Sequence, residues 1–130
     1  MYDSFDKFLS SSPDFSIIDK GEDSIVFEYK ELHYFFVYDP NDPYYIRLML
    51  PNIISKEDFE KKQNININDV INNYNTDFKA IKLIIVDNSL WLSIEQFVYS
   101  KDNIRQLFTR LISILETVIS HFRENHLQTK

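Results

Sequence analysis

Hydrophobic residues between Ser24 and Leu50 recur with a period of two, the spacing of consecutive β-strands. One face of these strands is almost wholly apolar and carries Ile25, Phe27, Tyr29, Leu32, Tyr34, Phe36, Tyr38, Tyr44, Ile46, Leu48 and Leu50. The second face is mixed and carries Val26, Phe35, Val37, Tyr45 and Met49 with Glu28, His33 and Arg47. An antiparallel sheet with one face in water should alternate apolar with polar residues. The pattern therefore predicts a second face that meets a partner.

Turn residues set the expected strand boundaries. The predicted strands are residues 24–29, 32–38, 44–50, 80–86 and 90–97, and residues 15–18 are a candidate for a further short strand. Lys30 and Glu31 are expected to form a two-residue hairpin loop, and the two prolines of residues 39–43 indicate a turn. Pro51 is expected to end its strand, because proline lacks the backbone N–H of a ladder hydrogen bond. Residues 87–89 should turn a second hairpin, whose mixed face carries Lys82, Ile84, Val86, Trp91, Ser93, Glu95 and Phe97.

Three segments have the three- and four-residue spacing of an amphipathic helix. The first is residues 4–10, and the second starts near the N-cap Ser55 and runs to Tyr74. Its middle, residues 61–68, is the weakest part, because asparagine is a poor residue for the interior of a helix and the alternation there also fits a strand. We expect a helix, continuous or broken, in preference to that strand. The last helix is expected over residues 101–125, capped by Ser100, with a polar tail from about residue 125. The sequence thus predicts one α+β domain over residues 1–130, with an antiparallel sheet of about five strands and three helices.

Composition removes several classes of protein. The chain has no cysteine, which excludes disulfides, thiolate nucleophiles and zinc–cysteine sites. Its net charge of −6 argues against a nucleic-acid partner, because phosphate binding needs clustered Lys and Arg. The opening MYDSFDKFL has neither a basic start nor a long apolar run, and no stretch approaches a membrane span. We expect a cytoplasmic protein without a membrane partner.

Residues with the chemistry of an active site are few and scattered. His121 and His126 are five apart, whereas helical zinc ligands need a spacing of four. The single glycine excludes a glycine-rich phosphate loop. Glu28 and Glu95, sharing the mixed face with Arg47, are the best enzyme candidates, although an ion pair on a wet sheet explains them as well. We therefore predict no enzymatic activity, no cofactor and no metal site.

Three interpretations of the mixed face remain open. It lies beneath a helix of the same chain, forms a homodimer interface, or makes a groove for a client protein. Aromatic residues, Met and intervening Arg are typical of protein interfaces. The predicted contact residues are Phe35, Tyr45, Arg47, Trp91 and Phe97.

Three stretches carry a resemblance to a known fold. They are IVFEYKELHYFFVY (residues 25–38), NNYNTDFKAIKLIIVDNSLWLSIEQF (residues 72–97) and DNIRQLFTRLISILETVISHF (residues 102–122). In the order α-β-β-β(-β)-α-β-β-α they resemble the type III secretion chaperone-like fold, and more narrowly the YbjN-like family of bacterial sensory-transduction regulators. The resemblance spans residues 5–122. It implies an antiparallel sheet packed on helices, usually dimeric, without enzymatic activity; secretion chaperones of this fold bind extended client segments.

Two functional hypotheses follow from these observations. The first is a non-enzymatic protein-binding domain, chaperone-like or regulatory, that acts as a homodimer. The second is an immunity-type inhibitor that blocks a basic partner surface with an acidic patch comprising Glu22, Asp23, Asp39 and Asp42.

Overall fold

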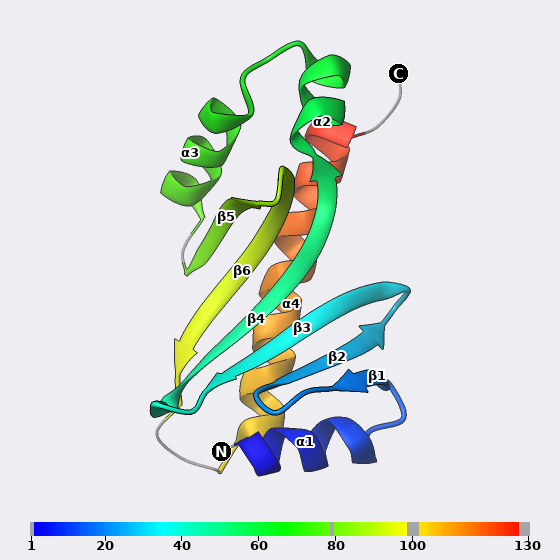
Figure 1. The fold of residues 1–130 in the computed structure, drawn as a ribbon, viewed down its shortest axis with the longest axis vertical. Helices are drawn as coiled ribbons and strands as arrows, with labels where there is room; N and C mark the ends of the chain where they lie inside the picture. Colours follow the sequence, from blue (N-terminus) through cyan, green and yellow to red (C-terminus); the bar gives the residue numbers. More distant parts are fainter. Residues whose placement is uncertain (1, 79, 99–101, 128–130) are drawn as a thin grey trace.

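A computed structural model describes residues 2–78, 80–98 and 102–127. It confirms the α+β class: the described residues form a six-stranded antiparallel sheet in the order β1-β2-β3-β4-β6-β5, with four α-helices (Figure 1). The strands are β1 (Ser16–Lys20), β2 (Ser24–Tyr29), β3 (Leu32–Asp39), β4 (Asp42–Ser55), β5 (Ile81–Val86) and β6 (Ser89–Phe97). The helices are α1 (Tyr2–Ser11), α2 (Lys56–Gln63), α3 (Ile67–Asp77) and α4 (Ile104–Phe122), followed by the π-helical turn η1 (Arg123–Leu127).

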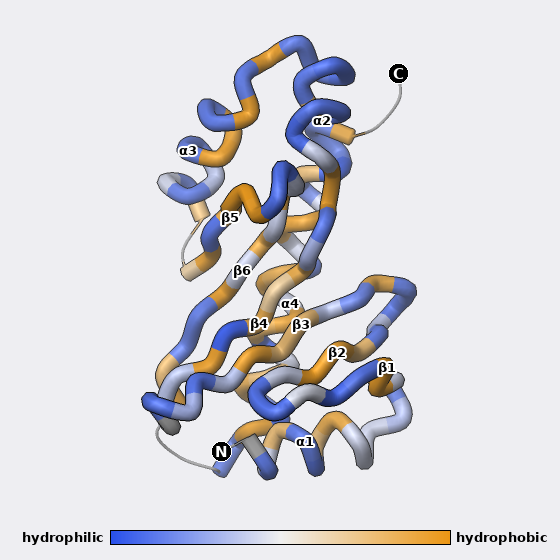
Figure 2. The backbone as a smooth tube through the Cα atoms, in the orientation of Figure 1, coloured by the Kyte–Doolittle hydropathy of each residue, from blue (hydrophilic) through white to orange (hydrophobic). Residues whose placement is uncertain are grey.

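Helix α4 covers one side of the sheet, and the three shorter α-helices pack against α4 near the ends of the sheet. Helix α4 runs behind the strands, α1 lies at the end near β1, and α2 and α3 lie at the opposite end (Figure 1). Ring contacts tie each shorter helix to α4: Phe5 of α1 to Phe108, and both Phe59 of α2 and Tyr74 of α3 to Phe122. The hydrophobic colour in Figure 2 is concentrated on α4 and on the strands, whereas the α2–α3 unit is largely hydrophilic.

The predicted apolar face of the sheet packs against these helices and is called the inner face below. Its members Ile25, Phe27, Tyr34, Phe36, Ile46, Leu48 and Leu50 are all buried. Phe108 of α4 is fully buried at the centre of an aromatic cluster, where it contacts the rings of Phe5, Phe8, Phe15, Phe27 and Phe36. Tyr44, expected on this face, is instead 49% exposed near the start of β4.

The prediction that Pro51 ends its strand is wrong. Strand β4 continues to Ser55, and the ladder between β4 and β6 shifts register between Leu50 and Ile54. Asn52 within the shift has a φ of 52°, a left-handed conformation that asparagine tolerates better than most residues. An irregularity of this kind leaves ladder positions unpaired, which is where a strand can accept proline.

The asparagine-rich segment is a break between two helices. Ser55 caps α2 as predicted, since its Oγ accepts a hydrogen bond of 3.1 Å from the Asp58 N–H. Asn64 ends α2 with a φ of 53°, and Asn66 starts α3 by accepting a hydrogen bond of 2.8 Å from the Asn68 N–H. Asparagine is favoured at both kinds of helix end. The broken form of the predicted helix is therefore the one observed.

The hairpins and the last helix differ slightly from their predicted bounds. Lys30 and Glu31 both have positive φ, as a type I′ hairpin turn requires. Asp87 and Asn88 make the same two-residue turn, so Ser89 belongs to β6 and not to the loop. Helix α4 begins at Ile104 with Asn103 as its cap residue, and the predicted cap Ser100 lies outside the described residues.

The burial of Tyr34 on the inner face can be tested by substitution. Its side chain is fully buried, and its hydroxyl has no hydrogen-bond partner among the described residues, so burial raises its pKa. A buried hydroxyl without a partner costs about 1–3 kcal/mol. We expect Tyr34→Phe to raise the free energy of unfolding by about 1 kcal/mol, measured by urea denaturation.

Tyr74→Phe is the matched control for this prediction. The Tyr74 hydroxyl shares a hydrogen bond of 2.6 Å with His121 Nδ1. Its removal should therefore lower stability, by about 1 kcal/mol. A loss of stability in Tyr34→Phe as large as that in Tyr74→Phe would contradict the assignment of Tyr34 as unpartnered.

Candidate functional site

The side of the sheet opposite the helices is the mixed face predicted from sequence. We call it the outer face and define it by Val26, Glu28, His33, Phe35, Val37, Tyr45, Arg47, Met49, Lys82, Ile84, Val86, Trp91, Ser93, Glu95 and Phe97. Helix α4 lies behind the sheet in Figure 1, and no helix of the described residues crosses the strands on the opposite side. The interpretation that places this face beneath a helix of the same chain is therefore excluded for the described residues.

The middle of the outer face is an apolar row that crosses the sheet. Val26, Phe35, Met49 and Ser93 are neighbours across β2, β3, β4 and β6. The rings of Phe35 and Trp91 have centroids 5.7 Å apart, although their strands lie on opposite sides of β4. This contact explains why Met49 is only 9% exposed on a face without a helix. Phe35 and Trp91 are themselves half-buried, and their rings form the apolar surface at the middle of the outer face.

A charged row lies beside the apolar one. Arg47 Nη2 and Glu95 Oε1 of adjacent strands are 3.1 Å apart, and Lys82 Nζ lies 3.9 Å from Glu95 Oε2. Arg47 also donates a hydrogen bond of 3.0 Å to the Tyr45 hydroxyl, and its guanidinium lies 5.9 Å from the centre of that ring. The hydrogen bond to Tyr45 is the main reason that the pKa of Arg47 is raised. Tyr45 in turn contacts Phe97, which is 53% exposed.

Three polar atoms on this face have no hydrogen-bond partner among the described residues. They are Arg47 Nε, Trp91 Nε1 and Ser93 Oγ, and Ser93 is only 3% exposed. Buried polar groups in folded proteins are nearly always hydrogen-bonded, so three such atoms on one face call for an explanation. The five contact residues predicted from sequence, Phe35, Tyr45, Arg47, Trp91 and Phe97, all lie on this face.

The best enzyme candidates are not brought together. Glu28 lies on β2 directly opposite His33 of β3, whereas Glu95 lies on β6 opposite Arg47. Strands β3 and β4 lie between β2 and β6, and neighbouring strands are about 4.8 Å apart. The carboxylates of Glu28 and Glu95 are therefore too far apart to share a hydrogen bond. No group of three or more His, Asp or Glu side chains in the described part of the chain could hold a metal ion.

The two helical histidines belong to a packing cluster at the end of α4. His121 is bound to Tyr74, and burial raises the pKa of that tyrosine to about 12. His126 packs against Phe59 and Phe122, and burial together with the nearby His121 lowers its pKa. The backbone carbonyls of His126 and Leu127 accept hydrogen bonds from Gln63 and Lys62 of α2. These contacts hold η1 against α2, and they give the histidines a structural role.

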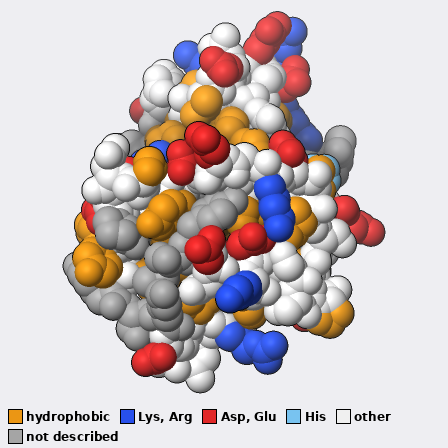
Figure 3. Space-filling view, turned by 60° about the horizontal axis from the view of Figure 1, so that its bottom comes forward, with side chains coloured by type: hydrophobic (Ala, Val, Ile, Leu, Met, Phe, Trp, Pro, Cys, Tyr) orange, Lys and Arg blue, Asp and Glu red, His pale blue; other side chains and the backbone are white. Residues whose placement is uncertain are grey.

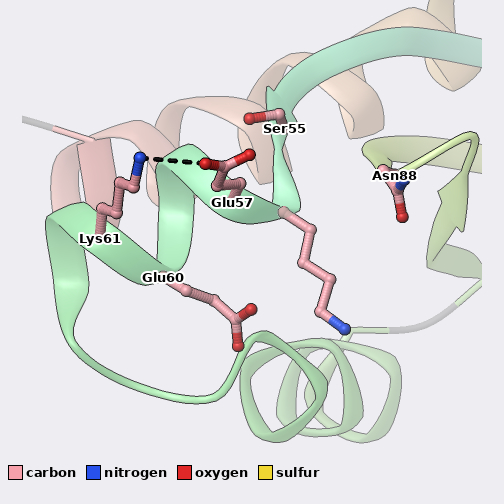
Figure 4. Close-up of a pocket in the computed structure, with 6 residues that line it drawn as sticks. Ser55, Glu57, Glu60, Lys61 and Asn88 are labelled. Carbon is pink, nitrogen blue, oxygen red and sulfur yellow. Dashed lines mark ion pairs between the residues drawn. The ribbon is translucent and has the colours of Figure 1, made fainter.

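A hollow of about 550 Å³ at the start of α2 is the other candidate site (Figure 4). It is lined by Ser55, Lys56, Glu57, Glu60, Lys61 and Asn88. Glu57 and Lys61 point toward one another and form an exposed ion pair of 3.0 Å, while Glu60 points away from them. The carboxylates are thus dispersed around an open hollow and do not form a catalytic pair.

The four residues of the predicted acidic patch lie at one end of the sheet. The carbonyl of Asp23 accepts a hydrogen bond of 2.8 Å from the N–H of Tyr38, next to Asp39. Asp39 and Asp42 face one another across the β3–β4 turn. Their carboxylates accept hydrogen bonds from nearby backbone N–H groups, those of Asn41 and Tyr44. These local bonds account for the presence of Asp39 and Asp42 in the turn without a binding partner.

The chain has no match among models of protein families, curated proteins or solved structures. The resemblance to the secretion chaperone-like fold and the YbjN-like family therefore stays a prediction. No helix in the described ranges is long and apolar enough to cross a membrane. The space-filling view of Figure 3 shows hydrophobic side chains interspersed with acidic and basic ones.

Proposed function

We propose that this chain is a non-enzymatic protein-binding domain, chaperone-like or regulatory, that contacts protein through its outer face. The observation that carries the proposal is an apolar and aromatic sheet face that no helix of the described residues covers. Exposed apolar patches rimmed by polar residues mark interaction sites in proteins. In this role the face meets either a second copy of the chain or a segment of a client protein.

The composition of the face supports a protein partner over a small molecule. Aromatic side chains, Met49 and Arg47 are residue types enriched in protein interfaces. The hollow at the start of α2 lies away from this face, and the side chains that line it are polar or charged. The predicted resemblance adds the chaperone-like role, and the lack of cysteine favours a cytoplasmic location.

Trp91→Ala and Arg47→Glu test this function. Truncating a tryptophan at the centre of an interface costs about 2 kcal/mol or more, so we expect protein binding to weaken by about 30-fold or more. Helical circular dichroism should not change. Binding is measured by quantitative capture from the native cells with mass spectrometry and by self-association of the purified chain.

Ile65→Ala is the matched control, because Ile65 is 44% exposed between α2 and α3, away from the outer face. Equal binding by all variants would refute the proposal, and unfolding of the Trp91 variant would assign that residue to stability.

The inhibitor hypothesis is the second candidate, favoured by the acidic residues gathered at one end of the sheet. It predicts one-to-one binding that weakens steeply with salt and does not depend on Trp91.

A further inference from the structure

We infer that the hollow between the α1–β1 connection and α4 binds a free aromatic amino acid. The residues of this hollow are none of those that define the outer face, so the inference goes beyond the proposed function. The hollow has a volume of about 390 Å³, within the range of about 300–1,000 Å³ of small-molecule sites. Its walls come from the end of α1, residues 12–15, the end of β2 and the start of α4.

Three aromatic rings form the apolar part of the hollow. Phe15 contacts both of the others, with its ring centroid 5.7 Å from that of Phe8 and 5.0 Å from that of Tyr29. All three side chains are only partly buried, so they offer ring surface to a ligand. Lys30, which lies 5.2 Å from the centre of the Tyr29 ring, is already paired with Glu116. An aromatic wall of this kind favours a planar apolar group, because rings gain energy from packing on rings.

Arg105 gives the hollow a positive charge that no other described residue neutralises. Its guanidinium carbon lies 5.9 Å from the centre of the Phe8 ring, and it forms no ion pair in the described part of the chain. A guanidinium held over a ring keeps its N–H groups for a planar carboxylate, which it can bind with two hydrogen bonds. Thr109 lies one helical turn further along α4 and adds a hydroxyl to the same wall. This wall therefore suits a carboxylate.

Asp14 gives the hollow a negative charge from the α1–β1 connection. Its N–H donates a hydrogen bond of 3.4 Å to Ser12 Oγ, and the Ser12 N–H donates one of 3.1 Å to the Phe8 carbonyl. These bonds anchor the connection to the end of α1. The Asp14 carboxylate forms no ion pair with Arg105 or with any other residue that the structure describes. This side of the hollow therefore suits an ammonium group.

The two charges together select the class of ligand. A simple anion would be repelled by Asp14, and a simple cation would be repelled by Arg105. A molecule with both an ammonium and a carboxylate pairs with both side chains at once. Free phenylalanine and tyrosine carry these two groups together with the planar ring that the aromatic wall accepts.

Isothermal titration calorimetry of the full chain with L-phenylalanine tests the inference. We expect a Kd of about 1 mM or tighter. The analogue 3-phenylpropionate lacks the ammonium group, and phenethylamine lacks the carboxylate. Each leaves one charge of the hollow unpaired, so each should bind about ten-fold more weakly or worse.

Two substitutions should weaken the binding of L-phenylalanine in the same way. Arg105→Gln and Asp14→Asn are each expected to raise its Kd by about ten-fold or more, because each removes one charged hydrogen-bonding partner. Both side chains are exposed, so circular dichroism should not change. Arg110→Gln on α4 and Asp77→Asn on α3 are the matched controls: they make the same changes of charge on exposed residues outside the hollow and should leave the Kd unchanged.

Amide NMR spectra locate the ligand independently. Titration with L-phenylalanine should move the amide signals of residues 12–15 and of Thr109 to saturation, and Arg105→Gln should abolish these changes. The inference is overturned if neither phenylalanine nor tyrosine binds at about 10 mM, if Arg105→Gln binds as tightly as the unmodified chain, or if 3-phenylpropionate binds as tightly as phenylalanine. None of these results affects capture of protein through Trp91, so the proposed function stands or falls separately.

Discussion

Replacing Phe108 by alanine is expected to lower the free energy of unfolding by about 3–5 kcal/mol. The ring is fully buried and lies among five other phenylalanine rings contributed by α1, the segment after it, β2 and β3. Its removal takes away contacts with all of them at once and leaves a cavity that rigid neighbours cannot fill. Domains of this size have a total stability of about 5–15 kcal/mol, so the variant should be close to unfolding.

Urea denaturation followed by circular dichroism measures this loss. Ile65→Ala serves as the control, because a large side chain that is 44% exposed should cost no more than about 0.5 kcal/mol. The error of such extrapolated free energies of unfolding is about 1 kcal/mol. A Phe108→Ala variant that differs from the unmodified chain by no more than this error would contradict the central place given to the ring.

Asn75→Ala is expected to cost about 1–3 kcal/mol and to promote aggregation. The Asn75 side chain accepts a hydrogen bond of 2.7 Å from the Leu83 N–H and donates one of 3.2 Å to the Leu83 carbonyl. It thus occupies the place of a neighbouring strand at the β5 edge of the sheet. Without it, the edge presents free backbone groups to which another chain can pair.

Asn73→Ala is the matched control, since both substitutions replace an exposed asparagine of α3 by a better helix former. The difference between the two variants therefore reports the bonds to Leu83. The free energy of unfolding measures the loss of stability, and light scattering at about 37 °C measures aggregation. Equal stability and equal scattering would show that the edge does not need Asn75.

Period-two alternation predicted most of the sheet because it reflects a local property, the alternate direction of side chains along a strand. Residues 24–29 were placed as β2 to the residue, and the inner face was assigned almost completely. The prediction failed at Pro51, where a register shift removes the need for a backbone donor. It was incomplete at Asn64 and Asn66, whose role as helix ends depends on their conformation.

The candidate site was predicted as a set of residues but not as an uncovered surface. Alternation places Phe35, Arg47 and Trp91 on one face, yet it cannot tell on which side the helices pack. That choice is made by contacts distant in sequence, such as Phe5 with Phe108. Asn75 was missed for the same reason, because nothing near it in the sequence marks a bond to a neighbouring strand.

The placement of α4 across the inner face has a consequence for the order of folding. The helix that covers the sheet comes after all six strands, and α1 at the start of the chain packs on its Phe108. During synthesis the strands therefore emerge before the residues that shield them from water. Contacts of such long sequence separation also slow folding. We expect the nascent chain to remain uncollapsed or to need a holding chaperone until α4 has left the ribosome.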